Sequence, residues 1–401
     1  MRILNVSTRM ILGGSQETVV VASEELARRG HEVHVAHGPV YGPEGSMTER
    51  IDAFRTGDGR GIARHVVPSM VRELSPVKDV RAYRELRALI ERVEPDVVHT
   101  HSSKAGVVGR GAAWRPPHHP RPGVVHTVHG SAFHEHERWW KNRVYVMSER
   151  WAAKRCDVMV TVSDSLAERY LRAGIGRREQ YETVISGMEM DSYDDVRAGE
   201  TREAVRAAIG IGDDDIVIGT VSRLFEMKGH DDVLDALGDV LRADARMKLL
   251  WVGDGLWRGR LTERIAGMGL RDSVVMTGLV EPGRIPGLIR AMDVLVHPSY
   301  REGLPRVVVQ AMLCGVPVVA TDIEGTGEVC EDRRTGRLVE AGDVAGLREA
   351  VMWMLEDRER ARVMASAARE RVRVRFDSRA MVDDLERVYA RAAREARSGC
   401  V

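Results

Sequence analysis

The sequence is poor in lysine and in aromatic residues, and it carries no excess charge of either sign. Its 401 residues include 60 basic and 60 acidic ones, and only six of the basic residues are lysines. A nucleic-acid-binding protein normally has a basic surplus, so this balance argues against that class. Hydrophobic residues make up 43% of the chain. That share is enough for packed cores, which argues against a disordered protein.

Cysteines and long apolar runs are also scarce. The four cysteines are scattered, without a C-x-x-C pair or a metal-ligand spacing; they are Cys156, Cys314, Cys330 and Cys400. Such cysteines are typical of reduced thiols in a cytosolic protein. No run approaches the roughly 20 apolar residues of a membrane-spanning helix, and no signal-peptide stretch follows Met1. We therefore expect a cytoplasmic protein, soluble or bound peripherally to the inner membrane face.

Short apolar runs alternate with longer helical patterns along the chain, which is too long for one ordinary domain. The alternation predicts right-handed βαβ units and parallel sheets with helices on both faces. It restarts after a polar segment at 187–195. We expect an α/β protein with two doubly wound, Rossmann-like domains facing across a cleft. Its parts are an N-terminal domain at 1–190, a second domain at 191–377 and a final helical segment at 378–401.

The expected strands matter because doubly wound sheets bind ligands at the carboxyl ends of their strands, beside helix N-termini. In the first half we predict strands at 2–6, 31–36, 96–100, 124–128, 158–162 and 182–186. In the second half we predict them at 216–221, 248–252, 274–276, 294–297 and 316–320. Residues that directly follow these strands are the candidates for a site.

Two cations lie in the loop that follows strand 216–221. Arg223 and Lys228 can converge there on one anion, and Gly229 stands beside them. A pyrophosphate fits, because arginine offers a bidentate fork and lysine a point charge. The alternative is that both are solvated loop charges.

Strand 294–297 leads into a loop that contains Glu302 and Gly303. Pro305 is suited to the first position of the helix that follows. Gly303 allows close approach of the backbone to a ligand, and the helix N-terminus offers N–H groups to phosphate or sugar oxygens. We expect Glu302 at the mouth of the cleft and Gln310 on the same side of the helix. A capping or surface role for Glu302 is the alternative.

Two further patterns in the second half are weaker. Gly253-Asp254-Gly255 resembles a G-x-G fingerprint, but no acidic residue ends the next strand where a ribose-binding carboxylate would stand. It predicts a tight turn beside the same nucleotide. Asp213-Asp214-Asp215 offers a D-x-D pattern, but it precedes its strand and so lies at the wrong end of the sheet. We interpret it as a solvated loop.

The first half carries a glycine loop and several histidines. Gly13-Gly14-Ser15 follows the first strand, where the glycines either accommodate a phosphate or serve a steric purpose. Four histidines follow strands or lie in them: His99, His101, His126 and His129. No convergent cysteine or carboxylate accompanies them, so we expect no metal site. His129 is expected to face the cleft as a neutral hydrogen-bonding group.

In their order and spacing these segments resemble the family 4 glycosyltransferases, which are retaining enzymes of GT-B fold. The likeness covers nearly the whole chain. It is carried by Gly13-Gly14, Val128-His129-Gly130, Thr161-Val162-Ser163-Asp164, Val184-Ile185-Ser186-Gly187-Met188-Glu189, Ser222-Arg223-Leu224 with Lys228-Gly229-His230, Gly253-Asp254-Gly255, and Glu302-Gly303-Leu304-Pro305 through Ala311, the family's E-x7-E region.

The resemblance implies roles for individual residues. A donor site would comprise Gly14, Arg223, Lys228, Gly253, Asp254, Glu302, Gly303, Leu304 and Gln310, and the reaction centre Glu302, His129, Arg223 and Lys228. Arg223 and Lys228 would bind the donor diphosphate, and Glu302 the sugar hydroxyls. Gln310 departs from the family, which has a second acid there for the ribose. Since an amide lacks the charge assistance of a carboxylate, we expect weaker or altered donor binding.

The expected reaction is transfer of a sugar from a nucleotide sugar, with UDP as the expected nucleotide, to a glycan, lipid-linked or small-molecule acceptor. Two cations and a helix N-terminus can stabilise the leaving diphosphate without a metal. No carboxylate pair suits double displacement, so retention would follow from front-face attack. We expect no cofactor and no metal.

Acceptor binding is predicted on the first half. The segment at 98–106 resembles one in family members that extend lipid-linked or polysaccharide glycans, and Ser103 and Lys104 would bind an acceptor phosphate. The helix at 138–155 mixes cations with aromatics: Arg138, Lys141, Arg143, Arg150, Lys154 and Arg155 with Trp139, Trp140, Tyr145 and Trp151. Such a helix suits an anionic membrane surface. The alternative has the aromatics packed inward and Lys104 serving the fold.

Three other functions stay open from the sequence. A UDP-sugar 2-epimerase shares the GT-B shape and would isomerise its donor without an acceptor. A non-catalytic nucleotide-sugar-binding protein is suggested by Gln310 alone. An NAD-dependent dehydrogenase would change NADH fluorescence on binding.

Overall fold

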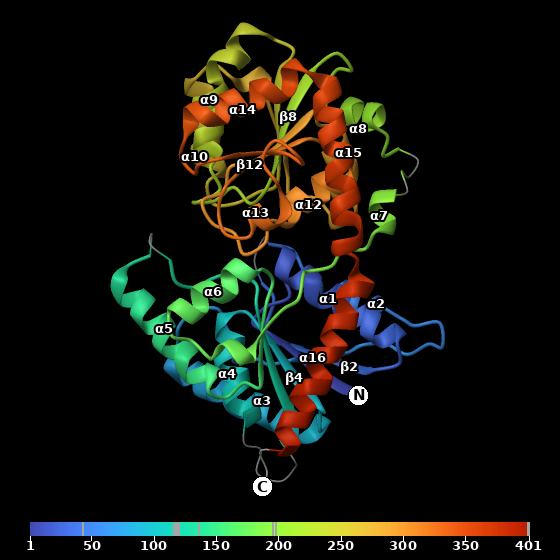
Figure 1. Cartoon of the computed structure of the whole chain (residues 1–401), viewed down its shortest axis with the longest axis vertical. Coiled ribbons are helices and arrows are strands. Elements are labelled where there is room, and N and C mark those ends of the chain that lie inside the picture. The colour runs from blue at the N-terminus through green and yellow to red at the C-terminus, as the bar shows by residue number, and fades with distance from the viewer. Residues whose placement is uncertain (42–43, 115–120, 135–136, 195, 197–198, 399–401) are drawn as a thin grey trace. The chain divides into compact units, whose positions relative to one another are not determined.

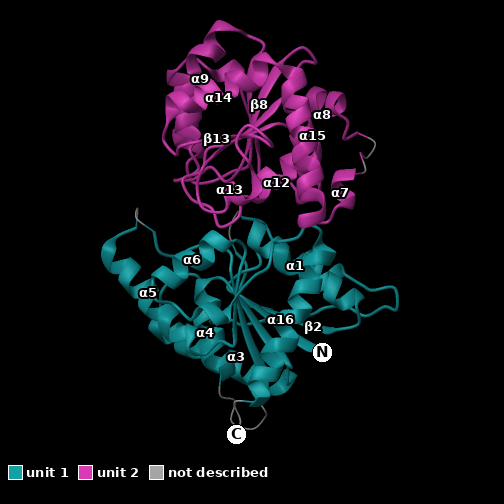
Figure 2. Ribbon diagram, viewed as in Figure 1, with its two compact units in different colours: residues 1–188, 376–401 teal, residues 189–375 magenta. Residues whose placement is uncertain are grey.

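The computed structural model describes residues 1–398 except 42–43, 115–120, 135–136, 195 and 197–198. The chain forms two compact units (Figures 1 and 2). Unit 1 comprises Met1–Met188 and Phe376–Val401, and unit 2 comprises Glu189–Arg375. Each unit has its own hydrophobic core and is described separately.

Unit 1 is built on a parallel sheet of seven strands in the order β3-β2-β1-β4-β5-β6-β7. The strands are β1 (Arg2–Ser7), β2 (Glu32–His37), β3 (Ala63–Val66), β4 (Val97–His101), β5 (Gly123–Val128), β6 (Val158–Thr161) and β7 (Tyr181–Thr183). Every residue of β4, β5 and β6 is buried, because helices cover both faces of the sheet.

The helices of unit 1 are α1 (Gly14–Arg28), α2 (Thr48–Ala53), α3 (Pro76–Val93), α4 (Ser103–Trp114), α5 (Trp139–Ala153), α6 (Asp164–Arg172), η1 (Arg178–Gln180) and α16 (Ser378–Ser398). Alternate strand residues face opposite sides of the sheet. Ile3, Val97 and Val125 share a core with α1 and α16. On the other face α4 packs so closely that a Cβ on Gly106 would lie 2.4 Å from the His126 ring. α3 and α5 both contact α4.

The last helix completes unit 1 although it follows unit 2 in sequence. The Met188 N–H donates to the Phe376 carbonyl at 2.7 Å, and the Ser378 N–H donates back to the Met188 carbonyl at 3.1 Å. α16 then lies against α1 and β5. Gly123 allows α16 to pack this closely, since a Cβ at position 123 would lie 2.7 Å from the backbone of Ala392. The core of unit 1 therefore depends on the C-terminal segment.

Unit 2 holds a six-stranded parallel sheet in the order β10-β9-β8-β11-β12-β13. Its strands are β8 (Ile216–Val221), β9 (Met247–Val252), β10 (Val274–Gly278), β11 (Val294–His297), β12 (Val318–Thr321) and β13 (Arg337–Val339). Its helices are α7 (Asp191–Asp194), α8 (Arg202–Ala208), α9 (His230–Ala243), α10 (Arg258–Gly267), η2 (Arg271–Ser273), η3 (Pro282–Arg284), α11 (Ile285–Arg290), α12 (Arg306–Leu313), α13 (Thr326–Val329), α14 (Val344–Glu356) and α15 (Arg358–Arg375).

Both units are doubly wound, as the sequence predicts. In each sheet the strand order reverses beside the first strand, between β1 and β4 in unit 1 and between β8 and β11 in unit 2. Such reversals are where ligands bind in open α/β sheets. The loops after these four strands are therefore the places to examine.

Several elements were not predicted, among them the strands β3 and β13 and the helices α2 and α15. β3 is a half-exposed edge strand of four residues, and β13 has three residues, so neither gives a clear apolar run. α15 is rich in arginine, and its buried face is mostly small: Ala361, Met364, Ala365, Ala368 and Val372. Alanines at helical spacing are a weak apolar signal, which explains why this helix was missed.

Candidate active site

The point where the strand order of unit 2 reverses holds an ionised carboxylate with three polar neighbours. Glu302 follows β11, and its Oε1 lies 2.5 Å from Lys228 Nζ, which follows β8. Ser299 Oγ donates to the same oxygen at 2.9 Å, and His297 Nε2 lies 3.2 Å from it. Burial opposes ionisation, but the charge of Lys228 and the neighbouring His297 outweigh it. They hold the pKa of Glu302 well below its usual value.

The two loops that carry this pair are joined by their backbones. The Tyr300 N–H donates to the Met227 carbonyl at 2.9 Å. Gly229 has φ of +67°, and a Cβ there would lie 2.0 Å from the Pro298 carbonyl oxygen. Glycine is therefore required both for its conformation and for the close contact. This packing fixes Lys228 beside Glu302.

Gly253-Asp254-Gly255 supports the loop after β8 from its other side. Gly253 has φ of +138°, and its Cβ would lie 2.1 Å from the Ser222 carbonyl oxygen. The Leu224 N–H donates to the Asp254 carbonyl at 3.0 Å. The Asp254 carboxylate accepts from its neighbour's N–H at 2.7 Å and lies 3.1 Å from Arg258. In this structure the G-x-G segment forms a tight turn against residues 222–224.

The remaining candidates of unit 2 lie around this centre. Arg223 is exposed in the loop of Lys228, with its guanidinium 5.9 Å from the Phe225 ring centroid. Gly303 and Leu304 are buried just before α12, and Gln310 is partly buried within it. The prediction for Pro305 was wrong by one position. It is the N-cap residue of α12, with φ −78° and ψ 84°, and the helix begins at Arg306.

In unit 1 the loops after β1 and β4 are joined by hydroxyl groups. The hydroxyls of Thr8 and Ser102 lie 2.7 Å apart, and the Ala105 N–H donates to Thr8 Oγ1 at 3.2 Å. Gly14 is exposed at the first position of α1, and Ser103 takes the first position of α4. Both helices therefore begin at the point where the strand order reverses, where a helix N-terminus favours an anion.

Lys104 differs from its expected role as a phosphate ligand. Its Nζ donates to Asp79 Oδ1 at 2.7 Å and to the Glu73 carbonyl, and its side chain is only 11% exposed. The ammonium is therefore already neutralised by a carboxylate of α3. This geometry agrees with the alternative in which Lys104 stabilises the fold.

The four candidate histidines, which are His99, His101, His126 and His129, form hydrogen-bonded groups. His101 Nδ1 lies 3.1 Å from His129 Nε2, and His101 Nε2 lies 3.3 Å from Asn5 Oδ1. His99 bonds Thr127 Oγ1 at 2.6 Å and the Tyr389 hydroxyl at 2.7 Å. Within the described parts of the chain, no group of three or more histidine, cysteine or acidic side chains is arranged to hold a metal ion.

Sequence reasoning missed several of these partners. His297 and Ser299 border the same strand end as Glu302 and could have been found by the strand-end rule. Asn5 lies inside a strand, and Tyr389 lies 290 residues from His99. Nothing local in the sequence marks either of them.

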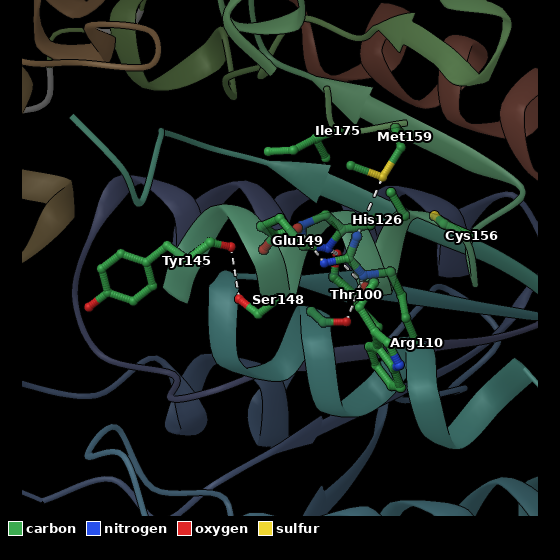
Figure 3. A network of polar contacts seen from close by, with 12 residues as sticks. Thr100, Arg110, His126, Tyr145, Ser148, Glu149, Cys156, Met159 and Ile175 are labelled. Atoms are coloured by element: carbon green, nitrogen blue, oxygen red, sulfur yellow. Dashed lines mark hydrogen bonds and ion pairs between the residues drawn. The ribbon is translucent and has the colours of Figure 1, made fainter. Parts of the chain in front are cut away.

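A buried ion pair fixes α5 on α4. Arg110 donates to Glu149 Oε2 at 2.7 Å, and the two side chains are 0% and 2% exposed. Figure 3 shows Arg110 between Glu149 and Met159. Burial raises the pKa of the nearby Cys156 thiol to about 12, so this cysteine is an inert thiol. Cys314 and Cys330 are also free thiols, and Cys400 lies outside the described residues.

The outer face of α5 is apolar and basic. Every exposed residue between 138 and 154 is either apolar or basic. The apolar ones are Trp139, Trp140, Val144, Met147 and Trp151, and the basic ones are Arg138, Arg143, Arg150 and Lys154. Trp139 is 75% exposed, so the aromatics do not all pack inward. None of the described helices is both long and apolar enough to cross a bilayer.

Comparison with known proteins gives the family. The model of Glycosyltransferase Family 4 matches residues 12–184, and that of Glycosyl transferases group 1 matches residues 201–371. The UDP-Gal:alpha-D-GlcNAc-diphosphoundecaprenol alpha-1,3-galactosyltransferase of Escherichia coli is 24% identical over 392 residues, which cover 97% of this chain and 96% of that protein. The 2-deoxystreptamine N-acetyl-D-glucosaminyltransferase of Streptomyces fradiae is 28% identical over 373 residues, covering 89% and 86% of the two chains.

A solved structure agrees in fold. Anabaena HepE in complex with UDP and glucose superposes with a TM-score of 0.82 and 22% identity, covering 97% of this chain and 99% of that one. The strand orders, the segments after β8 and β11, and matches to both family models point the same way. This chain belongs to the family 4 glycosyltransferases and is a glycosyltransferase of the GT-B fold.

Proposed function

We propose that this enzyme transfers a sugar from a UDP-sugar with retention of the anomeric configuration and without a metal ion. The observation that carries the proposal is the pair of Lys228 and Glu302 where the strand order of unit 2 reverses, with Arg223 in the same loop. UDP as the nucleotide is supported by the names of the Escherichia coli relative and of the HepE complex.

The chemistry requires charge stabilisation at the leaving group. The bond between the anomeric carbon and the phosphate oxygen breaks, and the acceptor oxygen attacks from the same face. The acceptor proton passes to the leaving phosphate oxygen, so the products are the glycosylated acceptor and UDP. Lys228 and Arg223 stabilise the negative charge that develops on the diphosphate. These fixed cations take the place of a metal ion.

Glu302 then serves the donor sugar. Its pKa is held well below the usual value, so it is ionised at neutral pH and can only accept hydrogen bonds. In the free protein it pairs with Lys228, and we propose that a bound diphosphate competes for the ammonium. Glu302 accepts from sugar hydroxyls, and the backbone at Gly303 and Leu304 contacts neighbouring oxygens of the donor.

The experiment is a transfer assay with a product analysis. The protein is screened with UDP and GDP sugars by thermal shift, in which a ligand at 100 times its Kd adds roughly 2.7 kcal/mol of stability. Transfer is then followed with EDTA present, and the anomeric configuration of the product is read by proton NMR. An inverted product would contradict front-face transfer, and loss of activity in EDTA would contradict metal independence. Isomerised donor without acceptor would indicate an epimerase instead.

For the acceptor we propose a lipid-linked glycan in an anionic membrane. The observation is the outer face of α5, where indoles and cations are exposed and no exposed residue between 138 and 154 is acidic. Indoles suit the interfacial region of a bilayer, and each cation near an anionic surface contributes about 1 kcal/mol. The buried pair of Arg110 and Glu149 holds this helix rigidly on the unit.

Vesicle sedimentation tests this docking. We expect the protein to sediment with phosphatidylglycerol vesicles at low salt, and less at high salt or with phosphatidylcholine alone. The double variant Trp139→Ser and Trp140→Ser should stay in the supernatant. Leu256→Ser is the matched control, because Leu256 is an exposed apolar residue of unit 2. Wild-type protein that stays in the supernatant at low salt would leave a soluble acceptor as the better account.

A further inference from the structure

The N-terminal half of α3 carries a second exposed apolar surface, besides the outer face of α5. Leu74, Val77 and Val80 are 73%, 64% and 53% exposed. Val77 and Val80 are about one helical turn apart, so their side chains lie on the same side of α3. Leu74 precedes the helix by two residues. Exposed apolar side chains that gather in this way indicate contact with a partner or a membrane.

The cations around these apolar residues have no acidic partner. Four exposed cations lie between residues 72 and 84, and they are Arg72, Lys78, Arg81 and Arg84. Within the described part of the chain, their side chains make no hydrogen bond or ion pair. Glu73 is the only exposed acid in this segment, all of which the structure describes. On α15, by contrast, three exposed arginines pair with carboxylates: Arg362, Arg371 and Arg373. The surface of α3 is therefore positive and complementary to an anionic partner.

The exposed faces of α3 and α5 are neighbours. Both helices contact α4 (Figure 1), and α4 has no exposed residue along its described length, 103–114. A Cβ on Gly111 of α4 would lie 3.0 Å from Trp151 of α5 and 3.6 Å from Tyr83 of α3. The two faces therefore border a single surface of unit 1, with α4 recessed between them.

Both faces expose apolar side chains at the same edge of unit 1. α3 joins β3 to β4, and α5 joins β5 to β6. A helix that joins two parallel strands runs back from their carboxyl ends to their amino ends. The N-termini of α3 and α5 therefore lie toward the carboxyl edge of the sheet. Leu74, which is 73% exposed, and Trp139, which is 75% exposed, stand at these two N-termini.

We propose that the N-terminal half of α3 enters an anionic membrane together with α5, so that the carboxyl edge of the unit 1 sheet faces the lipid headgroups. This inference rests on the proposed docking of α5 and adds a second helix and an orientation to it. Apolar side chains enter the interfacial region, and the unpaired cations meet lipid phosphates. An acceptor held in the bilayer then presents its reactive group close to the loops after β1 and β4.

The role of α3 is tested by its apolar residues. Sedimentation with vesicles of equal parts phosphatidylglycerol and phosphatidylcholine, over a range of lipid concentrations, gives the partition coefficient. Leu74→Ser with Val77→Ser should lower this coefficient by about tenfold or more, since burial of one such side chain shifts an equilibrium by about tenfold. Val363→Ser with Val374→Ser is the matched control, because these two valines of α15 are 60% and 79% exposed.

The cations of α3 are tested separately. Arg81→Gln with Arg84→Gln should lower the partition coefficient at low salt by about 25-fold, or about fivefold for each cation. The difference from the wild type should shrink at high salt, because salt screens exposed charges. All these changes are at exposed positions, and circular dichroism checks that each variant is folded.

The orientation is read from a bimane label on single cysteines. The background carries Cys314→Ser and Cys400→Ser, since Cys156 and Cys330 are buried. Val77→Cys and Ala88→Cys place the label at two exposed positions of α3 that are about 16 Å apart along the helix. With vesicles, we expect the bimane emission to shift to the blue at position 77 and to change little at position 88.

The outcomes separate this inference from the proposed docking of α5. Partitioning of the Leu74→Ser and Val77→Ser variant that equals the wild type would overturn the role of α3 and leave α5 as the only docking helix. Equal blue shifts at positions 77 and 88 would overturn the orientation. Wild-type protein that does not sediment at low salt would contradict the proposed docking itself, and this inference with it.

Discussion

The ammonium of Lys228 lies 2.5 Å from the carboxylate of Glu302, although 74 residues separate them in the chain. The two loops meet because β8 and β11 are neighbours in the sheet of unit 2. The pair keeps Glu302 ionised and holds a cation where the strand order reverses. A diphosphate that binds there has to draw Lys228 away from Glu302.

Removing this cation should slow the chemical step. We expect Lys228→Ala and Arg223→Ala each to lower the transfer rate by about 100-fold to 1,000-fold, the scale for one electrostatic contact to a transition state. Lys248→Ala is the control. Lys248 lies at the N-terminal end of β9, and its ammonium donates to the Asp272 carbonyl. Steady-state kinetics with EDTA present measures all three. Wild-type turnover in either active-site variant would show that the diphosphate binds elsewhere.

Gln310 should govern binding of the nucleotide. If its side chain bonds the ribose, Gln310→Glu adds charge assistance and tightens donor binding, and Gln310→Ala raises the donor KM by about twofold to tenfold. Donor affinity by calorimetry and donor KM are the measurements. Unchanged values in both variants would show that residue 310 does not contact the ribose.

Lys104 should act through the fold. Because its ammonium is paired with Asp79, we expect Lys104→Ala and Asp79→Ala each to lower the free energy of unfolding by up to about 1 kcal/mol. The double variant should cost less than the sum. The acceptor KM should stay unchanged in Lys104→Ala. A clear rise in that KM would restore the phosphate-binding role that the sequence suggests.

The buried pair of Arg110 and Glu149 allows a stability test. Arg110→Met or Glu149→Leu alone leaves an unpaired buried charge, and each should cost about 3–5 kcal/mol. The double variant should recover much of this loss, since two apolar side chains replace both charges. Urea denaturation of the four proteins gives the coupling free energy. Additive losses would mean that the two charges do not stabilise each other.

Buried histidines should make the protein sensitive to mild acid. Burial lowers the pKa of His99 to about 3 and that of His230 to about 4, and it lowers those of His101 and His126 well below the usual value. The unfolded chain takes up protons near pH 6.5, while these native imidazoles stay neutral. Between pH 6.5 and about 4 the unfolded state therefore binds more protons, and stability falls as pH falls.

Each such histidine contributes a slope of up to about 1.4 kcal/mol per pH unit in that window. Urea denaturation at pH 7.5, 6.5 and 5.5 measures it. His99→Gln should reduce the slope, whereas Arg60→Gln, an exposed control, should not. A free energy of unfolding that is equal at pH 7.5 and 5.5 would contradict the prediction.

The sequence by itself determined the α/β class and the residues that follow the strands. The periodicity of apolar residues can be read from short segments of sequence. A residue that follows a parallel strand always lies at the same edge of its sheet. Glu302, Lys228, Gly14 and His129 could therefore be chosen without a structure. The arginine-rich α15 and the edge strands β3 and β13 were missed because their apolar signal is weak.

Only the tertiary structure decided which groups meet. Strand order brings Lys228 to Glu302, strand register brings Asn5 to His101, and the return of α16 brings Tyr389 to His99. The tertiary structure also pairs Lys104 with Asp79 and leaves the indoles of α5 exposed. These relations depend on contacts between segments distant in sequence. Local periodicity carries no information about them, because the same pattern of residues is compatible with many pairings of strands and helices.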